Sequence, residues 1–206
     1  QPYWGTCVSA ETKSAAHGEG HYIVEIRPWL WFLSRTKNNQ IFQEMKVTDI
    51  IKEILGNYGF SGDLKVNHSG SDQTRTYCVQ YGETDLDFIK RLLEDEGFYF
   101  YFEFEDSAVK MVLADQPSTH GSAGEQDKYL YADEIYGGAR EQITSWELVE
   151  KAVTGKVTLR DYDFTKPSSD LTAKSTQPSG SHAHKSYESY AYPGGYTDVT
   201  HGEKRA

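Results

Sequence analysis

Two histidines near the C-terminal end of the chain have a spacing that could bind a metal ion. His182 and His184 would share one face of a strand, and His201 follows them. Imidazole is a common zinc ligand, but a structural zinc site needs four ligands at close spacing. No cysteine or carboxylate completes such a set at a recognisable spacing. The surrounding Ser, Gly and Pro residues indicate a loop, so we expect exposed histidines and predict no metal site.

Two groups of acidic residues could suggest general acid–base chemistry. Asp85 and Asp87 follow Thr84 at the expected start of a helix, where negative charge is favourable. The second group, residues 94–96, lies at the expected end of the same helix and is typical of a solvated face. The glycine loop at 121–126, GSAGEQ, lacks the Lys and Ser/Thr of a phosphate-binding loop. The sequence has no GxSxG elbow, Walker loop or dinucleotide fingerprint, so we predict no catalytic and no cofactor-binding residues.

An aromatic run, FYFYFEF at residues 98–104, could be a platform on which sugars stack. In a strand, alternate side chains point to opposite faces. The four Phe residues would share one face, and Tyr99, Tyr101 and Glu103 would share the other. Sugar platforms usually mix rings with polar hydrogen-bonding groups. The all-Phe face therefore favours a core or subunit contact, with the Tyr/Glu face at the surface.

The segment 76–113 that contains this run predicts strand, helix, strand and strand in that order. The helix would begin after Thr84 and end at Gly97, a residue suited to a left-handed cap. Its apolar residues fall on one face, with Phe88 at the edge of that face. Glu105 and Asp106 would form the turn of a hairpin whose second strand is VKMVL. The buried face consists of Leu86, Ile89, Leu92 and Leu93.

The rest of the chain predicts one further clear helix and several strands. Residues 47–59 have apolar residues at the i, i+3, i+4, i+7 spacing of a buried stripe. VSAETKSAAHGEGHYIVEIRPWLWFL, residues 8–33, predicts a hairpin with a polar turn around His17 to Gly20. RTKNNQIF, residues 35–42, predicts a turn followed by a short strand. LKV, residues 64–66, predicts a brief strand. Residues 141–165 predict two strands, because both halves alternate apolar and polar side chains.

The composition excludes several classes of partner. The chain has 206 residues and a net charge of −10, whereas surfaces that bind nucleic acid or anionic lipids need basic residues. No apolar run approaches the ~18 residues of a membrane-spanning helix. We therefore expect no nucleic acid partner and no stable membrane insertion. The 15 Tyr, 9 Phe and 4 Trp residues favour a β-rich protein with amphipathic surfaces.

The two cysteines, Cys7 and Cys78, are too few for a disulfide framework. Cys78 lies in a strand pattern between Tyr77 and Val79, where a free cysteine is typical of the core. We therefore predict a buried free thiol at Cys78. The chain begins without Met and ends in GEKRA, which is typical of a helix start. We expect it to be a piece of a longer polypeptide.

The order and combination of several segments resemble the VgrG family of type VI secretion spike proteins and the related baseplate hub proteins of contractile phage tails. Each segment alone is a packing pattern, and residues 116–140 have no pattern that aligns. The similar segments are RPWLWFL (27–33), QIFQ (40–43), VTDIIKEIL (47–55), YCVQYGETDLDFIKRLLEDEGFYFYF (77–102), GKVTLRDYDFTKP (155–167), YESYAYPGGY (187–196) and GEKRA (202–206).

The resemblance implies an α+β, mostly β protein. It would have phage tail hub-like antiparallel β-barrel domains and a small two-helix α+β insertion, assembled as a trimeric ring. Residues 1–46 would supply strands of the first hub barrel region, and residues 47–115 the insertion domain. Residues 116–206 would form the second hub barrel region, with the start of the neck beyond residue 206.

The resemblance also implies a mechanical role without catalysis or cofactors. The homotrimer would form the base of the spike and adapt the sixfold tail tube to the threefold needle. Its other partners would be the tail-tube protein hexamer, baseplate proteins, and needle tip and effector proteins. It would assemble in the bacterial cytoplasm and then be secreted or enter a target cell. The alternatives are a phage tail baseplate hub of the same fold, and a secreted sugar-binding or hydrolytic domain that uses the Tyr/Trp-rich surface.

Overall fold

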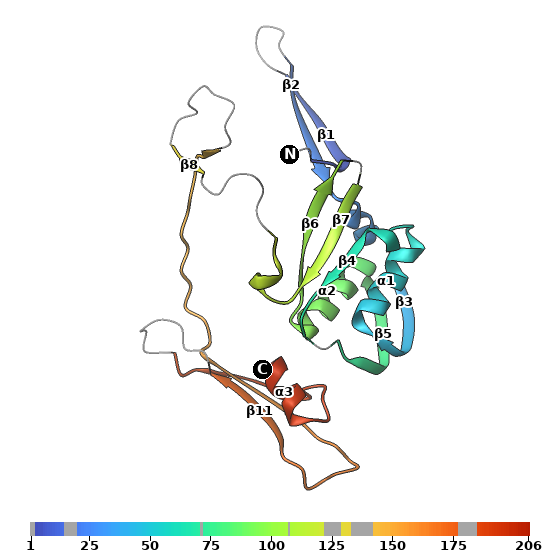
Figure 1. The fold of residues 1–206 in the computed structure, drawn as a ribbon, viewed down its shortest axis with the longest axis vertical. Helices are drawn as coiled ribbons and strands as arrows, with labels where there is room; N and C mark the ends of the chain where they lie inside the picture. Colours follow the sequence, from blue (N-terminus) through green and yellow to red (C-terminus); the bar gives the residue numbers. More distant parts are fainter. Residues whose placement is uncertain are drawn as a thin grey trace. The chain divides into compact units, whose positions relative to one another are not determined.

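The chain divides into two compact units in the computed structural model, Gln1–Gly121 and Ser122–Ala206 (Figure 1). Short two- and three-stranded sheets dominate both units in the part of the chain that the structure describes. The described residues are 3–14, 20–70, 72–106, 108–121, 129–132, 142–176 and 185–206.

The first unit opens with the predicted hairpin, which the structure confirms. Strand β1 (Thr6–Ser14) pairs antiparallel with β2 (Gly20–Arg27), with an irregularity between Cys7 and Ser9. The predicted turn falls largely on residues 15–19, which lie outside the described residues. Every residue of β2 is exposed, so neither face of this hairpin is covered by the rest of its unit.

The next segment differs from the sequence prediction in two ways. The apolar run WLWFL begins the 3₁₀ helix η1 (Trp29–Arg35), which buries Trp29, Leu30 and Leu33. The predicted short strand is wrong in length, because β3 (Lys37–Lys46) has 10 residues. It is long because it pairs antiparallel with β5 (Thr74–Thr84) from end to end. A distant strand, which local sequence cannot specify, sets this length.

Helix α1 (Val47–Asn57) confirms the predicted buried stripe. Val47, Ile50, Ile51, Ile54 and Leu55 are all buried. Its first turn is capped from a distance: the Asp72 carboxylate accepts hydrogen bonds from the Val47 and Thr48 backbone N–H groups, each 3.1 Å long. This contact satisfies two of the four donors that a helix start leaves free.

The segment after β5 follows the predicted order of helix, strand and strand. Helix α2 (Asp85–Glu96) begins at Thr84, whose hydroxyl accepts a 3.0 Å hydrogen bond from the Asp87 N–H. It ends at Gly97 with φ 72°, the left-handed conformation that glycine adopts without strain. Strands β6 (Tyr99–Glu105) and β7 (Ala108–Ala114) form the hairpin.

A third strand completes this sheet. The brief strand β4 (Leu64–Asn67) follows the short 3₁₀ helix η2 (Ser61–Asp63) and pairs parallel with β7, giving the order β4-β7-β6. A single 3₁₀ turn, η3 (Pro117–Thr119), follows β7.

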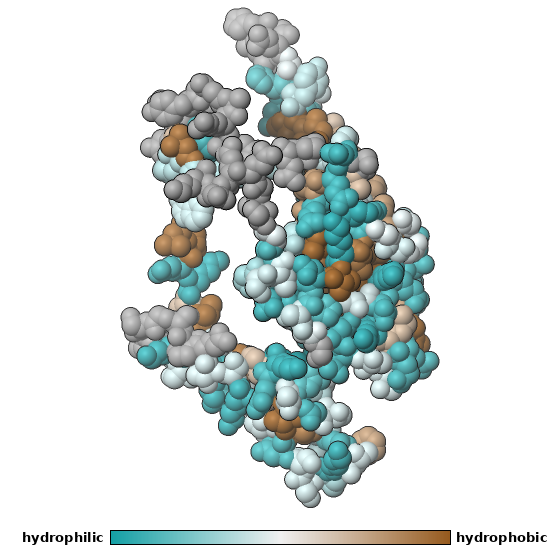
Figure 2. All heavy atoms as spheres, viewed as in Figure 1, coloured by the Kyte–Doolittle hydropathy of each residue, from teal (hydrophilic) through white to brown (hydrophobic). Residues whose placement is uncertain are grey.

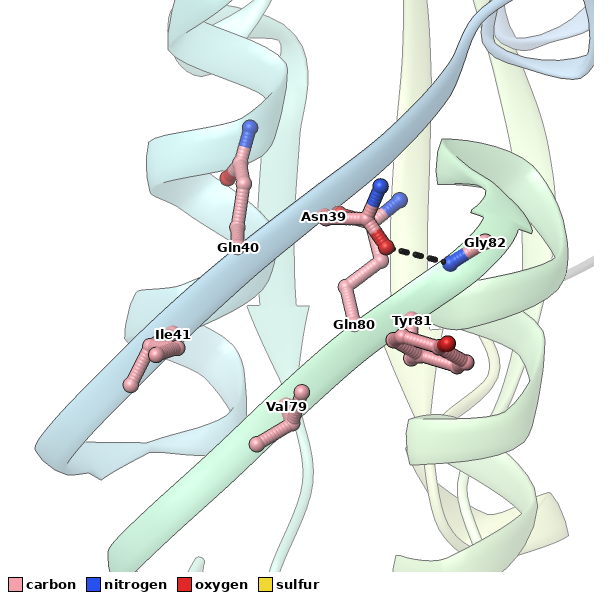
Figure 3. A pocket seen from close by; sticks show the side chains of 7 residues that line it. All are labelled: Asn39, Gln40, Ile41, Val79, Gln80, Tyr81 and Gly82. Atoms are coloured by element: carbon pink, nitrogen blue, oxygen red, sulfur yellow. Dashed lines mark hydrogen bonds between the residues drawn. The ribbon is translucent and has the colours of Figure 1, made fainter.

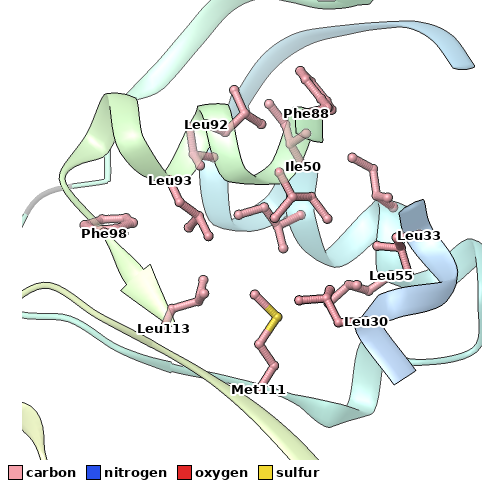
Figure 4. Close-up of a cluster of buried hydrophobic side chains, with 14 of the residues drawn as sticks. Leu30, Leu33, Ile50, Leu55, Phe88, Leu92, Leu93, Phe98, Met111 and Leu113 are labelled. Atoms are coloured by element: carbon pink, nitrogen blue, oxygen red, sulfur yellow. The ribbon is translucent and has the colours of Figure 1, made fainter. Parts of the chain in front are cut away.

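One hydrophobic core joins these elements (Figure 4). Its buried side chains come from η1, both helices, β3, β5 and β7, so the core draws on residues on both sides of Val47. The predicted helix face needs one correction. Phe88 is fully buried and stacks on Phe42 at 5.7 Å between ring centroids, whereas Leu86 is only partly buried. Because α2 packs against β5 and η1 at once, its buried face is turned toward Phe88.

The second unit contains five short strands in the described residues. They are β8 (Leu130–Tyr131), β9 (Gln142–Ile143), β10 (Lys156–Asp161), β11 (Leu171–Thr176) and β12 (Glu188–Ala191), and they precede helix α3 (Val199–Arg205). Strands β8 and β9 pair parallel with each other. Strand β10 pairs antiparallel with β11 and parallel with β12. Among the described residues, the sheets of this unit are small and open.

The predicted strand between Ile143 and Val149 is wrong beyond its first residues. Residues 144–154 form no helix or strand, and Trp146 and Leu148 are 74% and 81% exposed. Figure 2 shows apolar side chains along this segment. The alternating pattern is that of a strand, but a strand also needs a hydrogen-bonded neighbour. In the described part of the chain, no strand pairs with this segment.

A small core holds the β10–β11 pair and the C-terminal turn together. The Tyr196 ring is buried, and its hydroxyl donates to the backbone oxygens of Leu171 at 2.7 Å and Leu159 at 2.9 Å. The Asp161 carboxylate accepts from the backbone N–H groups of Gly195 and Tyr196. In the described part of this unit, apolar packing around Tyr196 and these hydrogen bonds together hold the elements in place.

Replacing Gly155 with Ala is expected to destabilise the second unit. A Cβ atom at this position would lie 1.9 Å from the Lys185 backbone oxygen, so one backbone segment would have to move. We expect a loss of ~2 kcal/mol or more in the free energy of unfolding, measured by urea denaturation. The exposed neighbour Thr154 is the control, and Thr154→Ala should change stability little. Equal stability of the two variants would contradict the close approach.

Candidate functional site

The acidic pair at the start of α2 has structural roles. Asp85 is buried, and its carboxylate accepts hydrogen bonds from the Tyr58 hydroxyl at 2.6 Å and the Gln80 amide at 2.7 Å. Burial raises the pKa of Tyr58, and the hydrogen bond to Asp85 raises it further. This network joins the end of α1 to the start of α2, which helix electrostatics alone did not predict. Asp87 lies at the surface and bonds the Thr84 hydroxyl at 2.6 Å.

The acidic group at the end of α2 is partly an ion-pair site. Glu94 is exposed, as predicted. The prediction of a solvated face is wrong for Glu96, whose side chain is 5% exposed and pairs with Arg75 at 2.8 Å. Arg75 also contacts Asp95 at 3.2 Å. Arg75 lies on β5, 20 and 21 residues before Asp95 and Glu96 in the sequence. Only the packing of β5 beside α2 brings these charged groups together.

The aromatic strand β6 confirms the predicted division of its two faces. Phe98 is buried, and the other three Phe rings pack against the core. On the opposite face, His120 stacks on Tyr101 at 4.7 Å between centroids, and its Nε2 lies 2.6 Å from the Tyr99 hydroxyl. The Tyr face is therefore occupied by a side chain of its own unit, which disfavours an open sugar platform.

Charged side chains occupy the end of the same face. Lys65 pairs with Glu103 at 2.8 Å and with Glu105 at 2.7 Å. The hydrogen bonds to Glu103 and then Glu105 raise the pKa of Lys65 well above its usual value. These groups form a surface ion-pair cluster of the kind that contributes little to stability.

The histidines considered as metal ligands and the glycine loop fall mostly outside the described residues. His182, His184 and all of 121–126 except Gly121 lie there. His201 lies in α3, and its backbone N–H group donates a hydrogen bond to the Asp198 carboxylate at 3.2 Å. In the ranges that the structure describes, no three His, Cys, Asp or Glu residues come together to hold a metal ion. None of the described helices is long and apolar enough to span a membrane.

The two cysteines lie in opposite environments. Cys78 is buried, which confirms the sequence prediction, and burial raises the pKa of its thiol. Cys7 is exposed on β1. The Cys78 environment is therefore not that of an activated thiolate.

The outer face of the β3–β5 ribbon is the clearest candidate for function. We define this β3–β5 outer face by three cross-strand pairs, Asn39–Tyr81, Ile41–Val79 and Gln43–Tyr77. Tyr81 is 84% exposed and Ile41 61%. A hollow of about 530 Å³ lies at the end of this face that carries the Asn39–Tyr81 pair, and seven residues line it (Figure 3). The Asn39 side chain is fixed there, because its oxygen accepts a 2.9 Å hydrogen bond from the Gly82 N–H.

The hairpin β1–β2 carries a second face of the same kind. We define the hairpin apolar face by the pairs Thr12–Tyr22, Ala10–Val24 and Cys7–Ile26. Figure 2 shows apolar side chains on the hairpin. The alternation of Tyr77, Val79 and Tyr81 with Cys78 and Gln80 was the sequence signal for the β3–β5 face. The defined pairs of both faces carry no charged side chain, which suits contact with another protein surface.

Comparison with known proteins places the chain in a family. The family model described as "Phage tail baseplate hub (GPD)" matches residues 3–206. The chain belongs to this baseplate hub family. The match takes in both units and every described residue.

Relatives of this hub chain carry names from type VI secretion. The type VI secretion system spike protein VgrG1b of Pseudomonas aeruginosa is 37% identical over 201 residues, which cover 97% of this chain and 27% of the relative. VgrG1c of the same organism is 37% identical over 206 residues, covering 99% of this chain and 28% of the relative. The chain thus spans just over a quarter of the length of these relatives.

Solved structures agree with the family. The E. coli c3393 protein, described as a type VI secretion component with similarity to T4 tail proteins gp27 and gp5, has a TM-score of 0.52 at 26% identity and covers 62% of this chain and 35% of its own. A tail protein from Neisseria meningitidis has a TM-score of 0.59 at 14% identity and covers 98% of this chain and 57% of its own. The second likeness concerns the fold alone.

Proposed function

We propose that this hub chain forms the base of a type VI secretion spike and acts as a structural part. The observation that carries the proposal is the 37% identity to VgrG spike proteins over nearly the whole chain. The described residues agree with a mechanical role, because their polar clusters are engaged in caps, ion pairs and buried hydrogen bonds. The chain would transmit force through packed units and would not catalyse a reaction.

The proposed architecture follows the segments of the family. Residues 1–46 would contribute strands to the first hub barrel region and residues 116–206 to the second. Residues 47–115 would form the α+β insertion. The exposed hairpin β1–β2 and the unpaired segment 144–154 support this arrangement, because both have the exposed apolar side chains of strands that pair within a larger assembly.

The proposed assembly is a homotrimer that joins a sixfold tail tube to a threefold needle. Its partners would be further copies of the chain, the tail-tube protein hexamer, baseplate proteins, and needle tip and effector proteins. It would assemble in the bacterial cytoplasm and leave the cell when the sheath contracts. No nucleic acid partner is proposed, since the net charge of −10 opposes phosphate binding.

A phage tail baseplate hub is the second candidate. It is favoured by tail proteins that share the fold over 98% and 97% of this chain. The two candidates share the hub role and differ in the machine that contains it. The neighbouring genes distinguish them, because sheath and tube genes beside capsid genes would indicate a phage.

The intact protein is expected to be a trimer in solution. Multi-angle light scattering across a dilution series should give the mass of three subunits, because a hub ring needs large permanent interfaces. Screening the same sample on a glycan array tests the sugar-binding alternative. A strictly monomeric protein that binds a glycan would refute the spike-base proposal.

A further inference from the structure

Two residues of the central strand β7 are buried although they do not belong to the core. Met111 and Leu113 lie in the core of the first unit, and Val112 and Ala114, which alternate with them, lie outside that cluster. Alternate side chains of a strand point to opposite faces. Val112 and Ala114 are nevertheless only 2% and 0% exposed. A second layer therefore covers the outer face of the β4–β7–β6 sheet.

The chain that follows β7 crosses this outer face as a strap, Gln116–His120. Asn67 of β4 and Tyr99 of β6 lie on either side of β7 in one cross-strand row. The Asn67 amide donates a 2.7 Å hydrogen bond to the backbone oxygen of Thr119. One residue later, Nε2 of His120 lies 2.6 Å from the Tyr99 hydroxyl. The strap is thus fastened to both neighbours of β7.

The His120 ring is the widest contact of the strap. It lies nearly parallel to the Tyr99 and Tyr101 rings, at interplanar angles of 14° and 20° and centroid distances of 5.6 and 4.7 Å. Tyr101 is the cross-strand partner of Val112, so this stack lies over the row that needs cover. His120 is also the last residue but one of the first unit. The strap therefore fixes the point at which the chain leaves this unit.

The fastenings of the strap are of a kind that opens at low free energy. Four of its five residues are exposed, and none of them belongs to the core. Its own structure is a single 3₁₀ turn, with 3.1 Å hydrogen bonds from the Thr119 N–H to the Gln116 oxygen and from the His120 N–H to the Pro117 oxygen. Such a turn does not persist alone. Segments with few buried apolar contacts open without global unfolding.

The residue before the strap is held more firmly. The Asp115 carboxylate accepts hydrogen bonds from the backbone N–H groups of Ser69 and Gly70, at 2.9 and 2.7 Å. It also accepts one from the Ser69 hydroxyl at 3.1 Å. Three bonds converge on one carboxylate oxygen directly after β7, so opening of the strap would stop at Asp115.

We propose that the strap is a two-state element that adjusts the length of the connection between the two units. Closed, it is fastened across β4 and β6. Open, it adds five residues, which span at most roughly 17 Å when extended, while the core of the first unit stays folded. In a hub, this slack would let the second barrel region reach its place before the connection is fixed. That use rests on the proposed function, whereas the opening itself does not.

Hydrogen exchange of the full chain tests whether the strap opens by itself. The Thr119 and His120 amides should have protection factors at least ~100-fold lower than those of the β7 amides, because their opening does not require the core to unfold. Mass spectrometry at single-residue resolution measures both sets. Equal protection of the strap and β7 would overturn the inference, since the strap would then open only with the whole unit.

Removing the His120 ring should release the strap. We expect His120→Ala to lower the protection of the strap amides at least ~10-fold further, because the stack and the contact with Tyr99 are both lost. The exposed neighbour Ser118 is the control, and Ser118→Ala should change protection by less than ~2-fold. The β7 amides should be unchanged in both variants. An equal loss of protection in β7 would mean that His120 supports the fold and would overturn a separate strap.

A substitution on the other side of the sheet tests whether the strap opens as one element. Asn67 contacts Thr119 and lies on β4, away from the His120 stack on β6. Asn67→Ala should lower the protection of the His120 amide as well as that of Thr119, by at least ~3-fold each. An effect confined to Thr119 would show independent contacts and would overturn the two-state element.

The outcomes separate the strap from the proposed function. A trimeric wild-type protein whose strap is as protected as β7 overturns this inference and leaves the spike-base proposal standing. A wild-type protein that is monomeric at all concentrations, with a strap that opens by itself, overturns the spike-base proposal and leaves the two-state strap.

Discussion

Replacing Ile89 with Asp is expected to prevent the first unit from folding. Ile89 is fully buried in the core between α2 and its neighbours. The described core residues around it are apolar, so the new carboxylate would have no partner and would be desolvated. Such a change costs roughly 4 kcal/mol or more, which is a large part of the 5–15 kcal/mol that stabilises a typical domain. Soluble expression and circular dichroism measure the outcome, and assembly should be lost with the fold.

The adjacent exposed residue gives the control for this substitution. Lys90 follows Ile89 on α2 and lies in water. Lys90→Asp introduces the same side chain into the same helix, and we expect it to cost less than about 1 kcal/mol through helix propensity and lost charge pairing. If Ile89→Asp folds and assembles as well as Lys90→Asp, the assignment of the buried face of α2 is wrong.

Removing the buried carboxylate of Asp85 is expected to have the next largest effect. Asp85→Ala would leave the partly buried Tyr58 hydroxyl and one hydrogen of the fully buried Gln80 amide without their acceptor. Each unsatisfied buried group costs about 1–3 kcal/mol, so we expect a total loss of about 2–5 kcal/mol in the free energy of unfolding. The contact between the end of α1 and the start of α2 should loosen, and hydrogen exchange at both places would report it.

Asp87 is the matched control for Asp85. It lies two residues later in the same first turn of α2, and its carboxylate bonds the Thr84 hydroxyl at the surface. Asp87→Ala should cost at most about 1 kcal/mol, because water replaces the lost contact. Urea denaturation of both variants compares them. Equal losses would mean that helix electrostatics explains Asp85 and that the buried network contributes nothing.

These two predictions bear on function through the β3–β5 ribbon. Gln80 lies on β5, and its side chain points toward the core while Val79 and Tyr81 form the outer face (Figure 3). The Asp85 network therefore fixes the strand whose opposite side carries the β3–β5 outer face. We expect Asp85→Ala to weaken assembly as well as folding.

The local elements were determined by the sequence itself. Helix α2 has its cap at Thr84, its stop at Gly97 and an apolar stripe between them, and all three signals act within a few residues. The buried stripe of α1 and the two faces of β6 are local in the same way, since periodicity alone marks the stripe and alternation alone separates Phe from Tyr and Glu. The resemblance of ordered segments to the VgrG family also required only the sequence, and the family match agrees with it.

Tertiary structure decided what depends on residues far apart in the chain. The length of β3 follows from its pairing with β5, and the absence of a strand at 144–154 follows from the lack of a neighbour in the described residues. The roles of Asp85 and Glu96 depend on Tyr58 and Arg75, which are distant in sequence. Periodicity shows which face of a helix or strand is apolar and where its charged residues lie. Only packing determines which partner it meets, because burial and hydrogen bonding are properties of the assembled elements.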